Sequence, residues 1–205
     1  MIRKSVAVFA LMLVDAVISR ADSGTEVVVR ILDGGTLRGP VLVQAKGIAR
    51  SILASAGVRV RWDRSTAVPQ PVRSGCAADE PAMTIGVRFS AKAPSGFSEG
   101  ALAAAAPFAN GGVGIVVFLD RLQRMTEMSA RPEILLGHVL AHEIGHMLLR
   151  TDAHSSTGLM KAHWNRMELA RMAFEPMKFT PEHAAYIRAN LGGGCRLMAA
   201  RRIVD

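Results

Sequence analysis

The chain has 205 residues, of which 50% are hydrophobic and 20% are charged. This length and this balance predict one domain that is large enough to bury a core. Lysine and arginine outnumber aspartate and glutamate by 25 to 17, which gives a formal net charge of +8. The basic residues are scattered and the sequence holds 1 Tyr, so we expect a solvated basic surface and no nucleic-acid partner.

The amino terminus has the pattern of a secretory signal peptide over 1–21. A short basic start precedes a mostly apolar run over 5–19, and small residues surround a cleavage point after Ala21. Cleavage would remove three basic residues and one acidic residue, so the formal charge would fall to +6. The apolar run is shorter than the roughly 20 residues of a membrane span. We therefore expect a secreted, periplasmic or extracellular protein with a single domain over 22–205 and no stable membrane insertion after cleavage; an uncleaved anchor is the alternative.

Cys76 and Cys195 are the 2 cysteines of the sequence. In an exported protein they could form a disulfide that ties the carboxyl-terminal tail to the domain. Their separation in space is not encoded in the sequence, so a disulfide and two free thiols both remain open at this point.

Alternation, helical spacing and turn residues predict strands and helices along the rest of the chain. In the first half, a strand, a helix that ends at Gly57 and a second strand make a β-α-β unit. A segment rich in small residues, 101–109, stays ambiguous, and the glycines 192–194 are expected to end the last helix. The predicted strands cover 26–32, 58–62, 83–89 and 114–119, and the predicted helices cover 40–56, 132–149, 161–172 and 181–190.

The continuous apolar run over 114–119 has two interpretations. As an edge strand, it could bind an extended substrate through main-chain hydrogen bonds at Gly114, Ile115, Val116 and Val117. As a central strand it would be buried on both faces, which an uninterrupted apolar run fits equally well. The sequence does not decide between them.

The segment from Pro132 to Leu149 predicts a helix with an apolar stripe. Pro132 suits the first helical position, and Glu133 lies favourably at the positive end of the helix dipole. Gly137 and Gly145 each cost about 1 kcal/mol relative to Ala in a helix interior. We therefore expect close packing against the helix at these two glycines.

Within this helix, the run His142-Glu-Ile-Gly-His146 carries the strongest functional signal of the sequence. Two imidazoles four residues apart project from one helix face and can reach a single zinc ion. Glu143 lies beside them and can act as a general base on a metal-bound water, a group that a purely structural site does not need. His138 lies one turn earlier, too far along the axis to join them, so we expect it to have a hydrogen-bonded structural role.

A catalytic zinc usually takes three protein ligands and leaves the fourth position to water. The polar run after the helix predicts an exit from which the chain can turn back toward the metal. Asp152 and His154 are the nearest candidates for the third ligand. His154 is preferred because imidazole is a good zinc ligand, whereas Asp152 could form a turn or orient a histidine. We expect His163 and His183 at the surface or at caps, although the pair His163-Trp164 is near enough in sequence to line the cleft.

The stretch 133–160 resembles the metzincin group of zinc peptidases. Their motif is His-Glu-x-x-His-x-x-Gly-x-x-His, followed by a turn that carries a methionine beneath the metal. The positions that correspond here are His142, Glu143 and His146, then His154, and then a Met-turn at Met160.

The resemblance has two departures. Leu149 stands where the pattern has its glycine, and Asp152 stands where it has its third histidine, so reaching His154 needs a loop two residues longer. That longer loop could relieve the need for glycine at a left-handed turn. Asp152 stays the alternative third ligand, since some secreted zincins that resemble this group use Asp there.

The resemblance implies an α+β fold of the zincin or metzincin type: a twisted mixed sheet packed on helices, an active-site helix, and a smaller, mostly helical and irregular carboxyl-terminal part. It implies a secreted zinc-dependent metallopeptidase with one catalytic Zn²⁺, which hydrolyses a peptide or protein substrate with Glu143 as base. The alternative is an exported zinc-binding or interaction protein with a zincin fold and little or no peptidase activity, which the unusual spacing to His154 favours. Tyr186 is the one Tyr, and nothing around it marks it as the oxyanion-stabilising residue.

Overall fold

The computed structural model describes residues 26–32, 37, 39–70, 81–109, 111–128 and 131–201. Within these ranges the chain forms strands and helices in the order β1, α1, β2, β3, β4, β5, α2, α3, α4, α5. The predicted signal peptide and Cys76 lie outside the described residues, as does the side chain of Cys195. Export and the disulfide therefore stay predictions.

The first three elements form the predicted β-α-β unit. Strand β1 (Glu26–Ile31) pairs in parallel with β2 (Arg59–Asp63), and helix α1 (Pro40–Ser55) connects them. Pro40 begins α1, where its missing N–H costs nothing. Gly57 follows the helix with φ 85°, a conformation that glycine adopts without strain.

The sheet has five strands in the order β2-β1-β3-β5-β4. Strands β3 (Met83–Ser90) and β5 (Val113–Phe118) continue the parallel part, and β4 (Ala103–Ala105) pairs antiparallel with β5 at the edge. The ambiguous small-residue segment thus contains a short strand.

The edge-strand interpretation of Gly114, Ile115, Val116 and Val117 is wrong. These residues lie in β5, which has β3 on one side and β4 on the other, so its main-chain groups are already paired within the sheet. The pairing partner β4 lies in the preceding small-residue segment, whose structure the sequence left ambiguous, and the apolar run by itself fits both interpretations. The free edge next to β5 belongs to β4.

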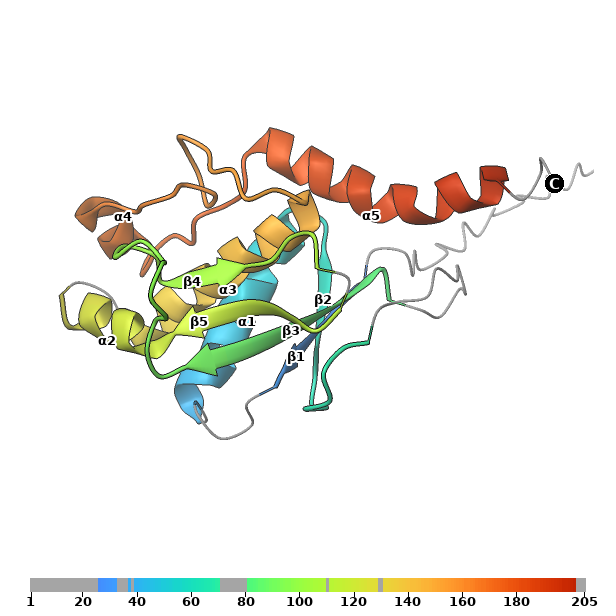
Figure 1. Cartoon of the computed structure of the whole chain (residues 1–205). Coiled ribbons are helices and arrows are strands. Elements are labelled where there is room, and N and C mark those ends of the chain that lie inside the picture. Colours follow the sequence, from blue (N-terminus) through green and yellow to red (C-terminus); the bar gives the residue numbers. More distant parts are fainter. Residues whose placement is uncertain are drawn as a thin grey trace, which may run out of the picture.

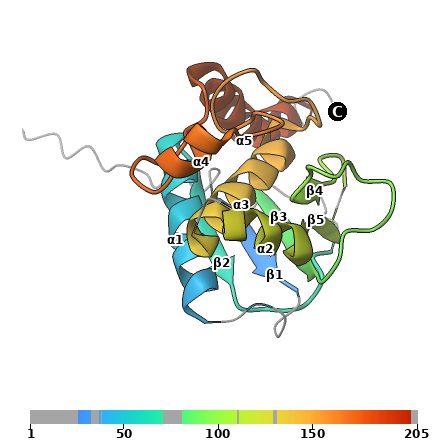
Figure 2. The same ribbon diagram turned by 90° about the vertical axis from the view of Figure 1, so that its left-hand side faces the viewer.

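Helix α3 (Pro132–Leu149) has the predicted bounds and lies beside α1 against one face of the sheet (Figure 1, Figure 2). The core fills the space between these two helices and the inward side chains of β1, β3 and β5. Nearly the whole of α3 is buried, with residues 134–148 all enclosed. The run His142-Glu-Ile-Gly-His146 is therefore carried by the most enclosed helix of the described chain.

Three further helices differ from the expected pattern. Helix α2 (Leu119–Met128) was not expected, helix α4 (Arg166–Arg171) begins later than expected, and helix α5 (Pro181–Arg201) continues through the glycines 192–194. The start of α4 is set by a capping box in which Asn165 and Glu168 bond each other's backbone N–H. Helix α5 contacts α3 through Asn190, whose amide donates to the Leu148 carbonyl at 2.9 Å.

The arrangement is a five-stranded mixed sheet with packed helices, which is compatible with the predicted α+β class. In the described part of the chain, none of the helices has both the length and the apolar character that a membrane crossing requires.

Candidate metal centre

The two histidines of the motif lie on the buried face of α3. His142 and His146 are 7% and 5% exposed, and Glu143 between them is 7% exposed. The helix has Pro132 at its first position and Glu133 in its first turn, as expected. Both ligand candidates therefore sit on a rigid helix rather than on a loop.

The two glycines of α3 are explained by close packing, as predicted. A Cβ on Gly137 would lie 2.7 Å from Ile48 of α1, and a Cβ on Gly145 would lie 2.7 Å from the Met160 sulfur and from the Phe179 ring. Real Cβ atoms do not come so close to other heavy atoms, so glycine at these positions lets α1 and the segment around Met160 approach the helix backbone.

Backbone carbonyls fix the orientation of both imidazoles. His142 Nδ1 donates to the Leu159 carbonyl at 2.9 Å, and His146 Nδ1 donates to the Thr151 carbonyl at 2.8 Å. A carbonyl only accepts, so in the neutral rings Nε2 carries the lone pair. The two Nε2 atoms face each other at 3.0 Å. Two lone pairs so close require a cation or a proton between them, and a tetrahedral zinc with bonds of about 2.1 Å would hold the nitrogens about 3.4 Å apart.

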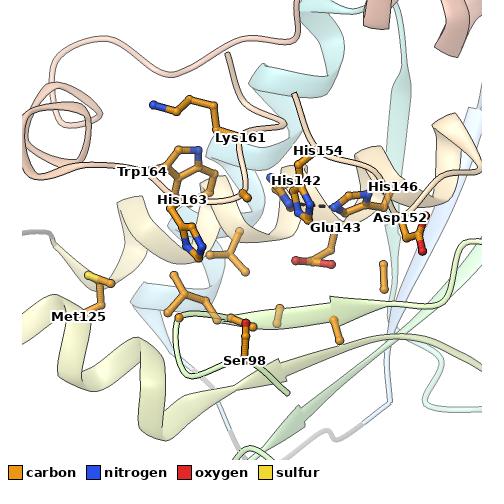
Figure 3. Close-up of a pocket in the computed structure, with 18 of the residues that line it drawn as sticks. Ser98, Met125, His142, Glu143, His146, Asp152, His154, Lys161, His163 and Trp164 are labelled. Carbon is orange, nitrogen blue, oxygen red and sulfur yellow. Dashed lines mark hydrogen bonds between the residues drawn. The ribbon is translucent and has the colours of Figure 1, made fainter. Parts of the chain in front are cut away.

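His154 completes a group of three histidines. The ligand atoms of His142, His146 and His154 all lie within 4.8 Å of one another, and their ring centroids are 4.7 to 5.4 Å apart. Unlike the other two, His154 is exposed and lies on the loop after α3. Asp152 is also exposed and does not belong to this group; Figure 3 shows it on the side of His146 away from His142.

Burial controls the protonation of the site. It lowers the pKa of His142 to about 4, although the bond to the Leu159 carbonyl opposes this, and it raises the pKa of Glu143 to about 8. Burial likewise lowers the pKa of His146 and of His154. The histidines are therefore held neutral, which is the form that binds a metal, and burial favours the protonated form of the Glu143 carboxyl group.

The segment that follows His154 passes beneath the site. The Ser155 N–H donates to the Met160 carbonyl at 2.8 Å, and Gly158 has φ 71°. Met160 is 1% exposed with its sulfur against Gly145, while the neighbouring Leu159 supplies the carbonyl that orients His142. A buried Met160 against α3 is compatible with the Met-turn interpretation. The functional role of Met160 stays a prediction.

A cavity of about 350 Å³ opens beside the three histidines and contains Glu143 (Figure 3). One wall is the loop from Ser98 and the strand β4, and the opposite wall is the segment from Lys161 to Trp164. Apolar side chains of α2, α3 and α4 close the rest of it: Met125, Val139 and Leu169. The carboxylate thus faces a space large enough for part of a peptide.

The remaining histidines, which are not in the group of three, lie in different surroundings. His138 donates through Nδ1 to the Ile134 carbonyl at 2.8 Å and accepts at Nε2 from the Met177 N–H at 3.1 Å, so it has the predicted structural role. His163 is exposed and lines the cavity, whereas His183 lies in the first turn of α5. Tyr186 is 66% exposed and is not among the residues that line the cavity.

Sequence reasoning missed the wall formed by Ser98 to Ala105 and the role of Trp164. The Trp164 ring packs edge-on to His142, with centroids 5.6 Å apart, and also to His138. A run of alanines carries no chemical signal, and a tryptophan after His163 gave only the hint that this pair could line the cleft. The first wall precedes α3 in the sequence and the second follows it, so neither belongs to the helix that carries the motif.

Searches of protein-family models, of curated proteins and of solved structures found no match to this chain. The assignment of the site therefore depends on its residues and their geometry.

Proposed function

We propose that this chain is an exported zinc metallopeptidase of the metzincin type that hydrolyses peptide bonds. The zinc ligands are His142, His146 and His154, and Glu143 is the general base. Asp152 is the alternative third ligand, and Met160 is the methionine of the turn beneath the metal.

One observation carries the proposal: the Nε2 atoms of His142 and His146 face each other at 3.0 Å, while both Nδ1 atoms are committed to carbonyl oxygens. A structural histidine such as His138 has both ring nitrogens hydrogen-bonded to the backbone, whereas His142 and His146 each have one ring nitrogen available for a shared cation. Three imidazoles are a typical donor set for zinc, and they leave its fourth position open.

When bound, Zn²⁺ lowers the pKa of a water and polarises the scissile carbonyl. The protein supplies the proton transfers. Glu143 takes a proton from the attacking water and passes it to the leaving amine, so that the C–N bond breaks, the acyl carbon gains OH and the amine gains H. The high pKa that burial gives Glu143 makes its carboxylate a stronger base, and a nearby cation would bring this pKa down toward neutrality.

The edge of β4 is suited to hold an extended peptide. The Leu102 carbonyl and the Ala106 N–H bond inward to β5, so by the two-residue alternation of a strand Ala103 and Ala105 direct their main-chain groups outward. Ala103, Ala104 and Ala105 all line the cavity that contains Glu143. A substrate added to this edge would gain main-chain hydrogen bonds beside the base. We place the substrate here rather than on β5.

The first test is metal content. The purified mature protein, stripped with a chelator and dialysed against zinc, should bind about one ion per chain. Elemental analysis and a competitive titration measure this. A folded protein that takes up no zinc would remove the central claim.

The second test separates a peptidase from a zinc-binding protein. Glu143→Gln should retain zinc and lose hydrolysis of a peptide library, because Glu143 acts on the water without coordinating the ion. Glu133→Gln, at the far end of the same helix, is the matched control and should keep the wild-type rate. A zinc-loaded wild-type protein that cleaves no peptide would favour the exported binding protein instead.

A further inference from the structure

One end of the cavity is crossed by a contact between its two walls. Gly100 belongs to the wall before β4, and His163 belongs to the opposite wall; a Cβ on Gly100 would lie 3.0 Å from His163 Cε1 and 3.3 Å from Nδ1. The imidazole therefore lies in van der Waals contact with the Gly100 backbone. Figure 3 shows the His163 side chain directed from its own wall toward the loop of Ser98.

Arg121 fixes the first wall. From helix α2, its guanidinium donates to the carbonyl of Ser98, to that of Ala101 at 2.7 Å and to that of Phe97 at 3.4 Å. It also lies over the Phe118 ring, 5.3 Å from the centroid. A planar group with several donors that bonds successive carbonyls holds this loop in one conformation.

The second wall is fixed on both sides of His163. Lys161 donates to Glu168 at 2.6 Å, and the same glutamate takes part in the capping box with Asn165. The Trp164 ring is half-buried against His142 and His138. His163 thus stands between two anchored neighbours, and its contact with Gly100 joins two held segments.

This contact limits a peptide that pairs with β4. A strand added to the edge lies about 4.8 Å from its neighbour. Beside Gly100 the His163 ring of the opposite wall touches this wall, so an added chain that lies along Ala103 to Ala105 meets the ring when it continues toward Gly100. Gly100 lies three positions before Ala103, about 10 Å in an extended chain, which is room for about one to three substrate residues.

We propose that His163 and Gly100 make this chain a peptidase that removes short pieces from the carboxyl end of its substrate. The inference rests on the proposed function. Antiparallel pairing, the commoner arrangement of adjacent strands, directs the carboxyl end of a peptide toward Gly100. Water adds across the scissile peptide bond, and the released piece of about one to three residues carries the new amine.

A peptide ladder tests this. Zinc-loaded protein is incubated with unstructured peptides of about 6 to 20 residues, which is on the order of two to seven times the longest predicted piece. The products are identified by mass spectrometry. Wild type should release short carboxyl-terminal pieces, whereas His163→Ala should raise cleavage at internal bonds about tenfold or more relative to terminal bonds, as expected when a steric block is removed. Met167→Ala, an exposed truncation on α4 that does not line the cavity, is the control and should keep the wild-type pattern.

Equal cleavage of internal and terminal bonds by wild type would overturn the proposal, as would release of short amino-terminal pieces. A His163→Ala variant with the wild-type pattern would remove the role of this residue.

A binding measurement keeps this test separate from that of the proposed function. Peptide hydroxamates that extend one or six residues beyond the metal-binding group are titrated into zinc-loaded protein. The short compound should bind at least about tenfold more tightly to wild type, and His163→Ala should abolish the difference. Equal binding of the short and the long compound to wild type would contradict the closed end of the cavity but would leave the metal centre unaffected. Failure of every hydroxamate to bind contradicts the metal centre, and with it the proposed function.

Discussion

The helical half of the candidate metal centre, His142 and His146 on α3, differs from its loop half, His154 and the segment around it, in how the fold holds each side chain. The helical pair is buried, and each ring is oriented by a backbone carbonyl. His154 is exposed, and its place depends on the path of the chain after the helix. The comparison indicates that one half of the site is preformed by a rigid element, while the other half is brought to it by the loop.

The largest expected effect tests whether the loop half takes part in binding. His154→Ala should lower zinc affinity by more than about 100-fold, because it removes a ligand, whereas Asp152→Ala should cost at most about 10- to 100-fold, the range for a residue that only orients a ligand. Competition with a chromophoric chelator measures both affinities. Tight binding that survives in His154→Ala and is lost in Asp152→Ala would reverse the assignment.

The next prediction concerns the charge enclosed in the helical half. The folded protein raises the pKa of Glu143 from 4.5 to about 8, so without metal its contribution to stability is present at low pH and is lost as the pH rises through about 8. Metal-free Glu143→Gln should therefore become progressively more stable than metal-free wild type between pH 4.5 and 8. Denaturant unfolding in a chelator across this range measures the difference.

The lowered pKa of His142 acts in the opposite direction, since its contribution is present above pH 6.5 and is lost as the pH falls toward 4. It is common to both proteins and cancels in the comparison. A constant difference between wild type and variant over the whole range would show that Glu143 is not desolvated.

A smaller effect tests the packing beneath the helical half. Gly145→Ala should destabilise the fold by about 1–3 kcal/mol, because the new methyl group meets the Met160 sulfur and Phe179. Gly47→Ala on α1 is the matched control: apart from its chain neighbours and the backbone of its own helix, nothing lies within 4 Å of its Cβ position, so it should stabilise by about 0.5–1 kcal/mol. Urea unfolding gives the change in the free energy of unfolding for both variants. Changes of the same sign in the two variants would contradict close packing at Gly145.

The smallest expected effect lies at the junction of the two halves. Arg150 ends α3 with φ 53° and ψ 49°, in the left-handed region, and its N–H donates to the His146 carbonyl. Arg150→Gly should stabilise the protein by about 0.5–1 kcal/mol, because glycine adopts this conformation without strain. Arg150→Ala keeps the Cβ and should give no such gain. A loss of stability in Arg150→Gly would show that the arginine side chain, rather than the turn, matters here.

The loop after α3 still begins with a left-handed residue. This residue is Arg150, one position after Leu149, which stands where the resembled pattern has its glycine. The sequence could not reveal the left-handed conformation of Arg150. The end of a helix depends on which carbonyl accepts from the next N–H, and arginine does not usually mark such a turn.

The sequence by itself determined α3 and the three candidate site residues on it, His142, Glu143 and His146. The spacing of His142 and His146 needs only the period of one helix, and the two glycines signalled close packing before any partner was known. The β-α-β unit was equally local, since its strands and helix follow one another along the chain.

The tertiary structure decided the features that join distant segments. The strand order placed β4 rather than β5 at the edge, and the walls of the cavity met at Gly100 and His163. Alternation and helical period describe how one element presents its side chains, and they carry no information on which elements become neighbours. The position of His154 beside the helical pair belongs to the same class, because it depends on a turn of the chain that a left-handed arginine makes.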